Sequence, residues 1–433
     1  MNNSIWAEIS LPSFSPLSQD TKTDVLIVGG GLAGLLCAYT LQQAGVDYLL
    51  VEADTICSGV TRNTTAKLTS QHGLIYDKLT KSFGVDAARA YYDANEAALA
   101  RYRELSQTIR CDFEEKPAYV YSTDGTSKLE RELLALQRIG ARASLVYQLP
   151  LPVKTTGAIR FDHQAQFHPL KFAAAISQGL HICEHTRVLA FEKNTCITDH
   201  GTIRAEKIII ATHFPMLNKH GAYFLKLYQH RSYVLALQHA QKLDGMYVDE
   251  DTAGLSFRNY GNLLLLGGGS HRTGKKGGSW QALSQFAHEQ YPDAREVCRW
   301  ATQDCMSLDA VPYIGRYGGG TQELYVASGF NKWGMTSSMA AAAILNDLVQ
   351  GRKNAYAEVF SPQRSMLHPQ LGANALEAVV NLLRPAKPRC PHMGCALHWN
   401  ESERSWDCSC HGSRFTKAGR LLDNPATADL KKP

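Results

Sequence analysis

Residues 23–34, TDVLIVGGGLAG, decide the fold of the front of the chain. The first six form an apolar, β-branched run that is typical of a buried parallel strand. Glycines then follow in the spacing GxGxxG, and residues 35–45, LLCAYTLQQAG, have a helical pattern that ends at a glycine. Residues 48–51, YLLV, read as a second strand. The stretch therefore predicts a strand–helix–strand unit with a glycine-rich first turn.

Each glycine of this turn has a distinct task in binding a dinucleotide. Gly29 permits the tight turn, Gly31 lets a diphosphate approach the backbone, and Gly34 lets the helix pack on the strand. The helix N-terminus at Leu32 and Ala33 offers free N–H groups and a positive dipole end to phosphate. Glu52, at the end of the second strand, is placed to accept a hydrogen bond from a ribose hydroxyl. The motif alone does not separate FAD from NAD.

Length and composition set the class of protein. The chain has 433 residues, which is too long for one core, so two or three domains are expected. It is 44% hydrophobic and 20% charged, as in a globular protein, with a net charge of +5 from scattered basic residues. There is no basic stripe interleaved with aromatic residues, so we expect no nucleic-acid partner. We expect no membrane span and no secretory signal, and therefore a cytoplasmic location.

Further segments resemble nucleotide-binding pieces. Residues 58–67, SGVTRNTTAK, are small and hydroxylated, suited to run beside a diphosphate and a flavin ring. A strand start lies near residue 188, and residues 208–212, IIIAT, form a strand that ends in small residues. Residues 324–336, LYVASGFNKWGMT, lead into an alanine-rich helix.

This order of segments, over residues 22–350, resembles the D-amino-acid oxidase/glycine oxidase superfamily of FAD enzymes, and most closely the bacterial branch that carries a Rieske tail. The resemblance implies an α/β fold with a Rossmann-like FAD-binding domain and an antiparallel-sheet substrate domain, followed by a small all-β Rieske subdomain. It also implies FAD as cofactor. The predicted FAD contacts are Gly29, Gly31, Leu32, Ala33, Gly34, Glu52, Ala53, Thr61, Thr65, Ala66, Lys67, Val188, Ala211, Thr212, Gly329, Asn331, Lys332, Trp333, Gly334, Met335 and Thr336.

The domain boundaries follow from the same reading. Residues 1–350 form the oxidoreductase, with FAD-binding parts at roughly 22–70, 181–215 and 305–350. The substrate domain takes roughly 71–180 and 216–304. Residues 351–386 are predicted as a linker that contains a helix, and 387–433 as the Rieske subdomain.

The tail carries two mixed ligand pairs, Cys390-Pro391-His392 and Cys408-Ser409-Cys410-His411. Two cysteines and two histidines suit a tetrahedral zinc ion, although zinc sites more often pair like with like. They equally suit a Rieske [2Fe–2S] cluster, in which one iron takes two thiolates and the other two imidazoles. Each pair ends in a tight turn, which favours the cluster.

The tail resembles the Rieske proteins of cytochrome bc complexes. By that resemblance the ligands are Cys390, His392, Cys408 and His411. The remaining pair, Cys395 and Cys410, would form a disulfide that braces the cluster loops, and residues 424–426 would be the third loop.

Two further positions bear on the reduction potential. Ser413 matches a serine that bonds a bridging sulfide in the Rieske family. Phe415 stands where the high-potential members have a tyrosine that bonds a ligand sulfur. Fewer hydrogen bonds to sulfur stabilise the reduced cluster less, so we expect a lower potential than in the respiratory proteins.

The segment between the halves predicts how the tail is attached. Residues 371–383 have a helical pattern, where an ordinary Rieske domain has strands of a base subdomain. About forty-five residues scarcely build a core of their own. We therefore expect the tail to dock on residues 1–350 rather than to swing on a tether.

Groups that could hold a substrate are less clearly marked. Members of the superfamily use Arg, Lys and Tyr to clamp a carboxylate and tune the flavin. The candidates here are Arg62, Lys67, Tyr233, His271, Arg272 and Lys332, of which Lys332, Arg62, Tyr233 and Arg272 are predicted as catalytic. His72 is read as structural.

The leading hypothesis is an FAD-dependent dehydrogenase that oxidises the C–N bond of a small amine or amino acid. Electrons would pass through the Rieske centre to an external acceptor. One alternative is an oxidase that reduces O₂ directly, with a structural metal tail. Another is a non-enzymatic redox sensor. The sequence does not name the substrate.

Overall fold

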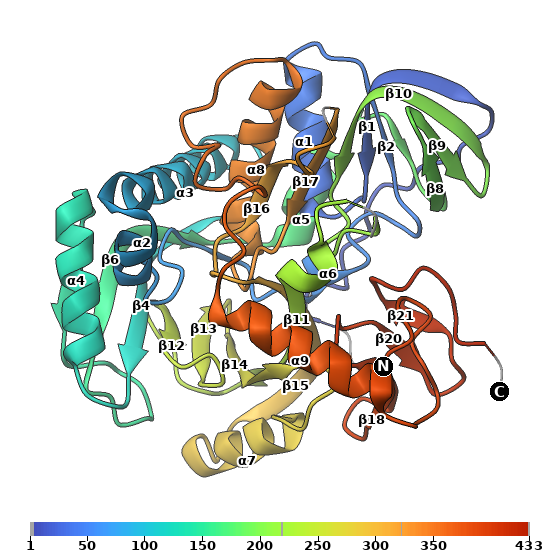
Figure 1. Cartoon of the computed structure of the whole chain (residues 1–433). Helices are drawn as coiled ribbons and strands as arrows, with labels where there is room; N and C mark the ends of the chain where they lie inside the picture. Colours follow the sequence, from blue (N-terminus) through green and yellow to red (C-terminus); the bar gives the residue numbers. More distant parts are fainter. Residues whose placement is uncertain (1–3, 218–219, 322, 432–433) are drawn as a thin grey trace.

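The computed structural model describes residues 4–217, 220–321 and 323–431 (Figure 1). The extreme ends of the first and last predicted domains, residues 1–3 and 432–433, lie outside the described residues. Three sheets organise this part of the chain, one mainly parallel, one mainly antiparallel and one small sheet in the tail. The predicted fold class is confirmed.

The first sheet contains the glycine-rich turn. Its path is β16-β17-β10-β1-β2-β7, with pairs β17/β10, β10/β1, β1/β2 and β2/β7 parallel. The strands β8 and β9 form a hairpin on the edge of β10. The bounds are β1 (Thr21–Val28), β2 (Tyr48–Val51), β7 (Ile182–Cys183), β8 (Val188–Glu192), β9 (Thr195–Thr198), β10 (Gly201–Ile210), β16 (Tyr313–Arg316) and β17 (Leu324–Ser328).

Helices α1 (Leu32–Gln43), α5 (Pro169–Ile176) and α8 (Gly334–Val349) pack together beside this sheet. The sequence of α8, GMTSSMAAAAILNDLV, is almost entirely small or apolar, and most of it is buried. Small side chains let α1 approach α8 closely, so both helices are buried on several faces. Helix α3 (Val85–Leu105) covers α8, with α2 (Tyr76–Phe83) and α4 (Ser127–Ile139) outside it.

The second sheet forms the predicted substrate domain region, in the order β15-β11-β14-β13-β12-β4-β6-β3, with β5 on the edge of β6. Its neighbours are antiparallel except for β12 and β4, which run parallel. The bounds are β3 (Lys67–Leu68), β4 (Glu114–Ser122), β5 (Ser144–Val146), β6 (Gly157–Gln166), β11 (Leu227–Gln238), β12 (Met246–Asp249), β13 (Ser256–Tyr260), β14 (Leu263–Arg272) and β15 (Arg295–Ser307).

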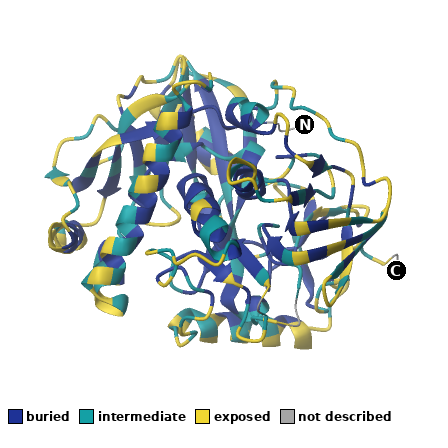
Figure 2. Ribbon diagram, turned by 90° about the horizontal axis from the view of Figure 1, so that it is seen from above, coloured by how far each residue is buried: buried dark blue, intermediate teal, exposed yellow. Residues whose placement is uncertain are grey.

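Three short helical elements complete this half. They are the 3₁₀ turn η1 (Val60–Asn63), α6 (Tyr223–Lys226) and α7 (Trp280–Gln290). The extent of burial depends on the layer. Strands of the first sheet are mostly buried, whereas the outer helices alternate buried and exposed positions (Figure 2).

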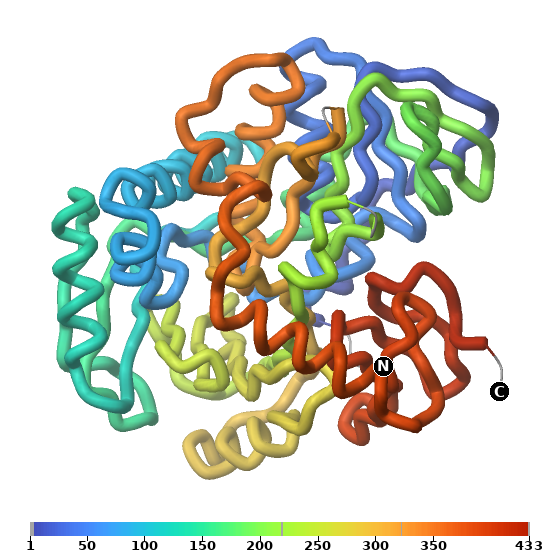
Figure 3. Tube along the Cα trace, in the orientation of Figure 1, coloured from blue at the N-terminus to red at the C-terminus, as the bar shows by residue number. Residues whose placement is uncertain are grey.

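Helix α9 (Pro369–Leu383) precedes the tail. The tail is a four-stranded antiparallel meander of β18 (Leu397–Asn400), β19 (Ser405–Cys408), β20 (Arg414–Thr416) and β21 (Leu421–Asp423). The helix predicted over residues 371–383 is confirmed. It begins two residues earlier, because proline is well suited to the first turn of a helix. The chain runs along α9 beside the larger half of the molecule and then folds back as the tail (Figure 3).

Candidate flavin site and iron–sulfur centre

The turn between β1 and α1 has the geometry of a phosphate cradle. Gly29 has φ +111°, and its N–H donates to the Val51 carbonyl at 2.9 Å. A Cβ atom on Gly34 would lie 1.9 Å from the Gly29 carbonyl oxygen, so only glycine lets α1 pack this close. Gly31 is the N-cap of α1 and has no side chain to bond the first-turn N–H groups. The positive end of the helix therefore suits a diphosphate.

Glu52 is held in place at the end of β2. Its Oε2 accepts from the Gly30 N–H at 2.6 Å, and its Oε1 accepts from the Asp54 N–H at 2.9 Å. Burial raises the pKa of Glu52, while these backbone donors lower it. Each carboxylate oxygen has a further lone pair, so the side chain can still accept from a ribose hydroxyl.

A large cavity starts at this turn and runs to the antiparallel sheet. Its volume is ≈ 1080 Å³, at the upper end of cofactor and ligand sites. It therefore has room for an extended dinucleotide and a small substrate. The loop at residues 420–429 of the tail lines the same cavity.

Most of the predicted FAD contacts lie on this cavity. Those that line it are Gly29, Gly31, Leu32, Ala33, Glu52, Ala53, Thr61, Thr65, Lys67, Val188, Ala211, Thr212, Asn331, Lys332, Trp333, Gly334 and Met335. The other four are not among the lining residues: Gly34, Ala66, Gly329 and Thr336. Two of these four have contacts inside the fold: Gly34 packs on Gly29, and the Thr336 hydroxyl donates to the Thr69 carbonyl.

Two lysines predicted from sequence face the cavity. Lys67 Nζ donates to the Thr65 hydroxyl at 3.1 Å, and burial lowers the pKa of Lys67 to about 7. Lys332 Nζ donates to the Thr252 carbonyl at 2.6 Å, and burial lowers its pKa as well. Both amines therefore release a proton more readily than an exposed lysine.

Tyr233, a predicted catalytic residue, also lines the cavity. Its ring stacks on His271 with 5.8 Å between centroids and meets Trp280 edge-on at 5.0 Å. Burial raises its pKa to about 12, so the phenol is neutral at physiological pH. Tyr233 remains a candidate, whereas His271 is not among the lining residues.

The two predicted catalytic arginines are elsewhere. Arg62 does not line the cavity. Arg272 turns toward the tail, where its guanidinium donates to the carbonyls of Ser409 and Cys410 and stacks over Tyr228 at 5.0 Å. Neither Arg62 nor Arg272 is therefore proposed to contact a substrate in this cavity. Arg272 binds the two halves together.

Sequence reasoning missed two groups on the cavity. His72, read as structural, lines it and stacks on Trp333 with 5.1 Å between ring centroids. Burial lowers the pKa of His72 to about 3, so its imidazole is neutral. Asp304 on β15 also lines the cavity. The one signal for Asp304 in the sequence was an acidic residue on a strand near the segment at residues 305–350 that was predicted to bind FAD.

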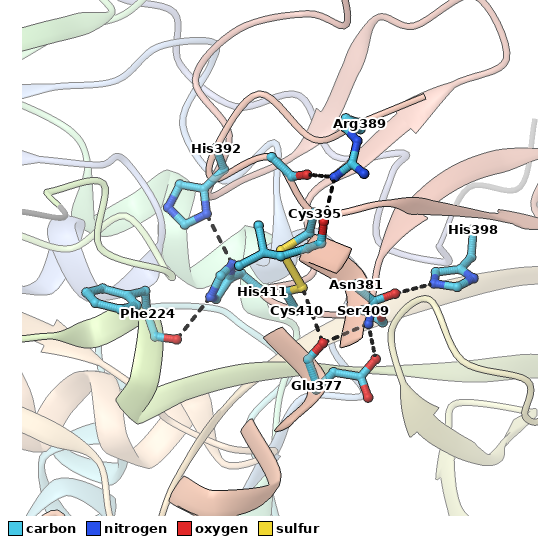
Figure 4. Close-up of a disulfide and its surroundings, with 12 residues drawn as sticks. Phe224, Glu377, Asn381, Arg389, His392, Cys395, His398, Ser409, Cys410 and His411 are labelled. Atoms are coloured by element: carbon cyan, nitrogen blue, oxygen red, sulfur yellow. Dashed lines mark hydrogen bonds between the residues drawn. A yellow bond between two sulfur atoms is a disulfide. The ribbon is translucent and has the colours of Figure 1, made fainter. Parts of the chain in front are cut away.

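In the tail, the four predicted cluster ligands converge. The imidazole Nδ1 atoms of His392 and His411 are 3.3 Å apart (Figure 4). The Cys390 and Cys408 sulfurs are within hydrogen-bonding reach of each other. The donors present fit a cluster held by two sulfurs and two Nδ1 atoms.

Both ligand loops close in the same way. The Gly394 N–H donates to the Cys390 carbonyl at 2.9 Å, and the Gly412 N–H donates to the Cys408 carbonyl at 2.8 Å. Both glycines have positive φ, 79° and 86°. These tight turns bring the following ligand back beside the first.

Cys395 and Cys410 form a disulfide between the two loops, with a Cα–Cα distance of 6.8 Å (Figure 4). The sulfurs of Cys395, Cys408 and Cys410 also lie within 4.8 Å of one another. Two of these are bonded to each other, so that group is not an alternative metal site.

The histidine edge of the centre faces the flavoprotein. His411 Nε2 lies 3.0 Å from the Phe224 carbonyl, which only accepts, so Nε2 carries the proton and Nδ1 is free to bind a metal. The Phe214 ring lies beside both imidazoles, with its centroid 6.2 Å from that of His392 and 6.1 Å from that of His411.

The docked position is fixed by polar contacts with β11 and β15. Arg231 forms two hydrogen bonds, of 2.7 and 2.5 Å, with the Glu403 carboxylate. Gln229 donates to the carbonyls of His411 and Asn424, and Gln303 donates to that of Gly412. The structure thus has the tail docked, as the length of the module led us to expect.

Comparisons with known proteins agree with this arrangement. A family described as FAD dependent oxidoreductase matches residues 24–348, and the Rieske [2Fe-2S] domain matches residues 379–433. The chain is 33% identical to the Rieske 2Fe-2S iron-sulfur protein YhfW of Bacillus subtilis (strain 168), over 98% of this chain and 95% of that protein. It is 24% identical to gamma-glutamylputrescine oxidoreductase of Escherichia coli (strain K12), over 78% of this chain and 86% of that protein.

The fold is similar to the crystal structure of glycine oxidase from Geobacillus kaustophilus, with a TM-score of 0.68 and 21% identity, covering 80% of this chain and 99% of that one. The chain belongs to the family of FAD-dependent oxidoreductases and carries a C-terminal Rieske [2Fe–2S] domain. It is therefore an enzyme whose cofactors are FAD and a [2Fe–2S] cluster, and the zinc alternative is wrong. Within the described residues, no helix combines the length and apolar character needed to cross a membrane.

Proposed function

We propose that the protein is a dehydrogenase that oxidises the C–N bond of an amine or amino acid and sends the electrons through its Rieske centre to an external acceptor. When bound, the flavin would serve as the hydride acceptor, and the cluster would serve as a one-electron carrier. The protein's own groups bind the substrate, orient it and exclude water.

One observation carries the proposal. The loop at residues 420–429, which belongs to the tail, lines the same cavity as the glycine-rich turn. Asn424 donates to the Thr212 carbonyl, at the end of β10, and Gln229 of β11 in turn donates to the Asn424 carbonyl. This loop of the tail is thus part of the wall of the cavity. This is the placement that supports electron transfer between the two cofactors.

The position of the histidine ligands supports the same direction of flow. His411 contacts Phe224 and Phe214 of the flavoprotein, so the histidine edge is turned inward. Relatives with printed activities, a gamma-glutamylputrescine oxidoreductase and a glycine oxidase, support an amine or amino acid as substrate.

The test is an anaerobic screen of amines and of D- and L-amino acids, with flavin absorbance and the electron paramagnetic resonance signal of the cluster recorded together. We expect a true substrate to bleach the flavin and then to reduce the cluster. Bleaching without cluster reduction, with rapid turnover in O₂, would instead establish an oxidase.

A matched pair of variants separates the two cofactors. His411→Ala should lose the cluster and keep substrate-dependent bleaching of the flavin. His398→Ala removes a tail histidine that bonds Asn381 and is not a ligand, so it should keep both. Equal rates of electron delivery to an artificial one-electron acceptor in both variants would contradict the proposed route.

A further inference from the structure

Asp304 lies where the second sheet forms part of the cavity wall. It lies on β15, where Thr302, Asp304 and Met306 all line the cavity. Residues two apart on a strand share one face, so this face of β15 forms the wall. The carboxylate is therefore the single charged group on that stretch of wall.

The neighbouring backbone places Asp304 beside the segment that the FAD enzymes use at the flavin. The Asn331 N–H donates to the Cys305 carbonyl at 2.8 Å, and the Asn331 side chain accepts from the Ser307 N–H at 3.0 Å. Strand β15 is thus bonded directly to residues 329–336. Lys332 of that segment is close enough to Asp304 for each to affect the other's charge.

The charge of Asp304 is only partly compensated. Across the described ranges of the chain, no ion pair within 4.0 Å includes Asp304, and the Ser232 hydroxyl lies near its carboxylate. Arg231, which also attracts it, is already bound by both oxygens of Glu403. Lys332 donates to the Thr252 carbonyl. Burial raises the pKa of Asp304 to about 6, which is the direction expected for an anion with too few partners.

An enclosed carboxylate of this kind is costly unless a donor meets it. The cavity wall offers further acceptors, since the loop at residues 248–252 also lines the cavity. A ligand group with several N–H donors and a positive charge would pair with the Asp304 carboxylate and with these acceptors. A ligand carboxylate at the same place would be repelled.

We propose that Asp304 binds the amino group of the substrate, so that the compound oxidised enters as an ammonium or amine with free N–H groups. The inference rests on the proposed function, because it assigns the substrate class of that same cavity. It makes Asp304 the residue that sets specificity by charge.

The test uses two unreactive probes of nearly the same shape and opposite charge. The tert-butylammonium ion has no hydrogen on the carbon next to nitrogen and is not oxidised, and pivalate replaces its ammonium group by a carboxylate. Each is titrated into the full-length holoenzyme while the flavin absorbance is followed. We expect tert-butylammonium to bind at least about tenfold more tightly than pivalate, a difference of ~1.4 kcal/mol.

Variants then assign the preference to one side chain. Asp304→Asn should weaken tert-butylammonium binding about tenfold or more and leave pivalate binding equal or tighter. Asp304→Glu should keep the preference for the cation. Thr302→Val changes the neighbouring position on the same wall without changing charge, so it should retain the wild-type ratio.

Equal affinity for the two probes, a preference for pivalate, or no effect of tert-butylammonium on the wild-type flavin spectrum would overturn the proposal. So would an unchanged ratio in Asp304→Asn. The wild-type titration needs no variant to fold. Because the probes are not oxidised, their binding is independent of the substrate screen, whose failure would count against the proposed function alone.

Discussion

The flavoprotein half and the tail are stabilised by different means. The main core of the flavoprotein joins side chains of α1, α3, α5 and α8 with strands of both large sheets. The described core of the tail contains four cysteines with Leu397, Phe415 and Ala426. Burial of so few apolar side chains does not balance the loss of chain entropy. The tail therefore needs covalent, metal and docking contributions that the larger half does not.

Buried charge is the second difference. Arg414 of the tail forms ion pairs with Glu403, Asp407 and Asp423, and Arg231 from β11 adds a fourth pair to Glu403. These groups are largely enclosed, so their energy depends on every partner being present. The tail is therefore a dependent module. A variant that destabilises the flavoprotein half should also destabilise the tail, whereas a variant in the tail should affect the flavoprotein half less.

The largest effect is expected from Gly34→Ala. The new Cβ would lie 1.9 Å from the Gly29 carbonyl oxygen. This oxygen belongs to the backbone, so it cannot move aside as a flexible side chain could. We expect loss of bound flavin together with loss of the cluster, measured by absorbance and by iron content. Gly372→Ala in α9, where a Cβ meets nothing within 4 Å, is the control and should retain both cofactors. A Gly34→Ala protein with an intact cluster would show the tail to be independent.

Arg231→Met comes next. It removes the β11 partner of Glu403 and leaves a buried carboxylate short of one cation. Breaking such a pair costs about 3–5 kcal/mol. We expect the cluster to be lost at lower temperature in a melt followed by visible absorbance, with the flavin retained. Arg299→Met, which breaks the more exposed pair with Glu296 on β15, should cost only about 0–1 kcal/mol. Similar melts for the two variants would refute the dependence on docking.

Acid should loosen the tail in a defined pH range. Burial opposes ionisation of Glu403, but Arg231 and Arg414 outweigh it and lower its pKa to about 2. A folded pKa below the unfolded value of about 4.3 gives stability that is complete above pH ~4.3 and lost as the pH falls toward 2. The contribution is about 3 kcal/mol. Visible circular dichroism of the cluster should stay constant from pH 8 to 5, and a loss already between pH 8 and 6 would exclude Glu403 as its cause.

The smallest effect concerns the cluster itself. Phe415 is fully buried in the tail core, at the position where high-potential relatives have a hydroxyl. Phe415→Tyr should raise the midpoint potential without changing docking, because a hydrogen bond to a ligand sulfur stabilises the reduced form. The wild-type potential should lie below about +300 mV. A potentiometric titration that shows no rise in the variant would mean that the hydroxyl does not reach a sulfur.

The parts of the site that could be predicted from the sequence are those whose function requires particular residues at short, fixed spacings. A phosphate cradle needs glycines at fixed offsets, and Gly29 and Gly34 have the φ angle and the close contact that only glycine allows. The cluster needs Cys and His at short spacing, and the Nδ1 atoms of His392 and His411 do converge. The helix before the tail was equally readable, since its periodicity is local.

Only the tertiary structure decided which side chains face the cavity and which face the tail. Arg272 and Asp304 look alike in sequence, each a charge on an alternating strand, yet Arg272 turns to the tail and Asp304 lines the cavity. The inward-facing histidine edge depends on Phe224, and the docking on Arg231, residues far from the tail in sequence. Sequence by itself thus determined the two cofactors, because their motifs are local. Packing determined how the tail docks on the flavoprotein half, because contacts over long sequence separations depend on the whole fold.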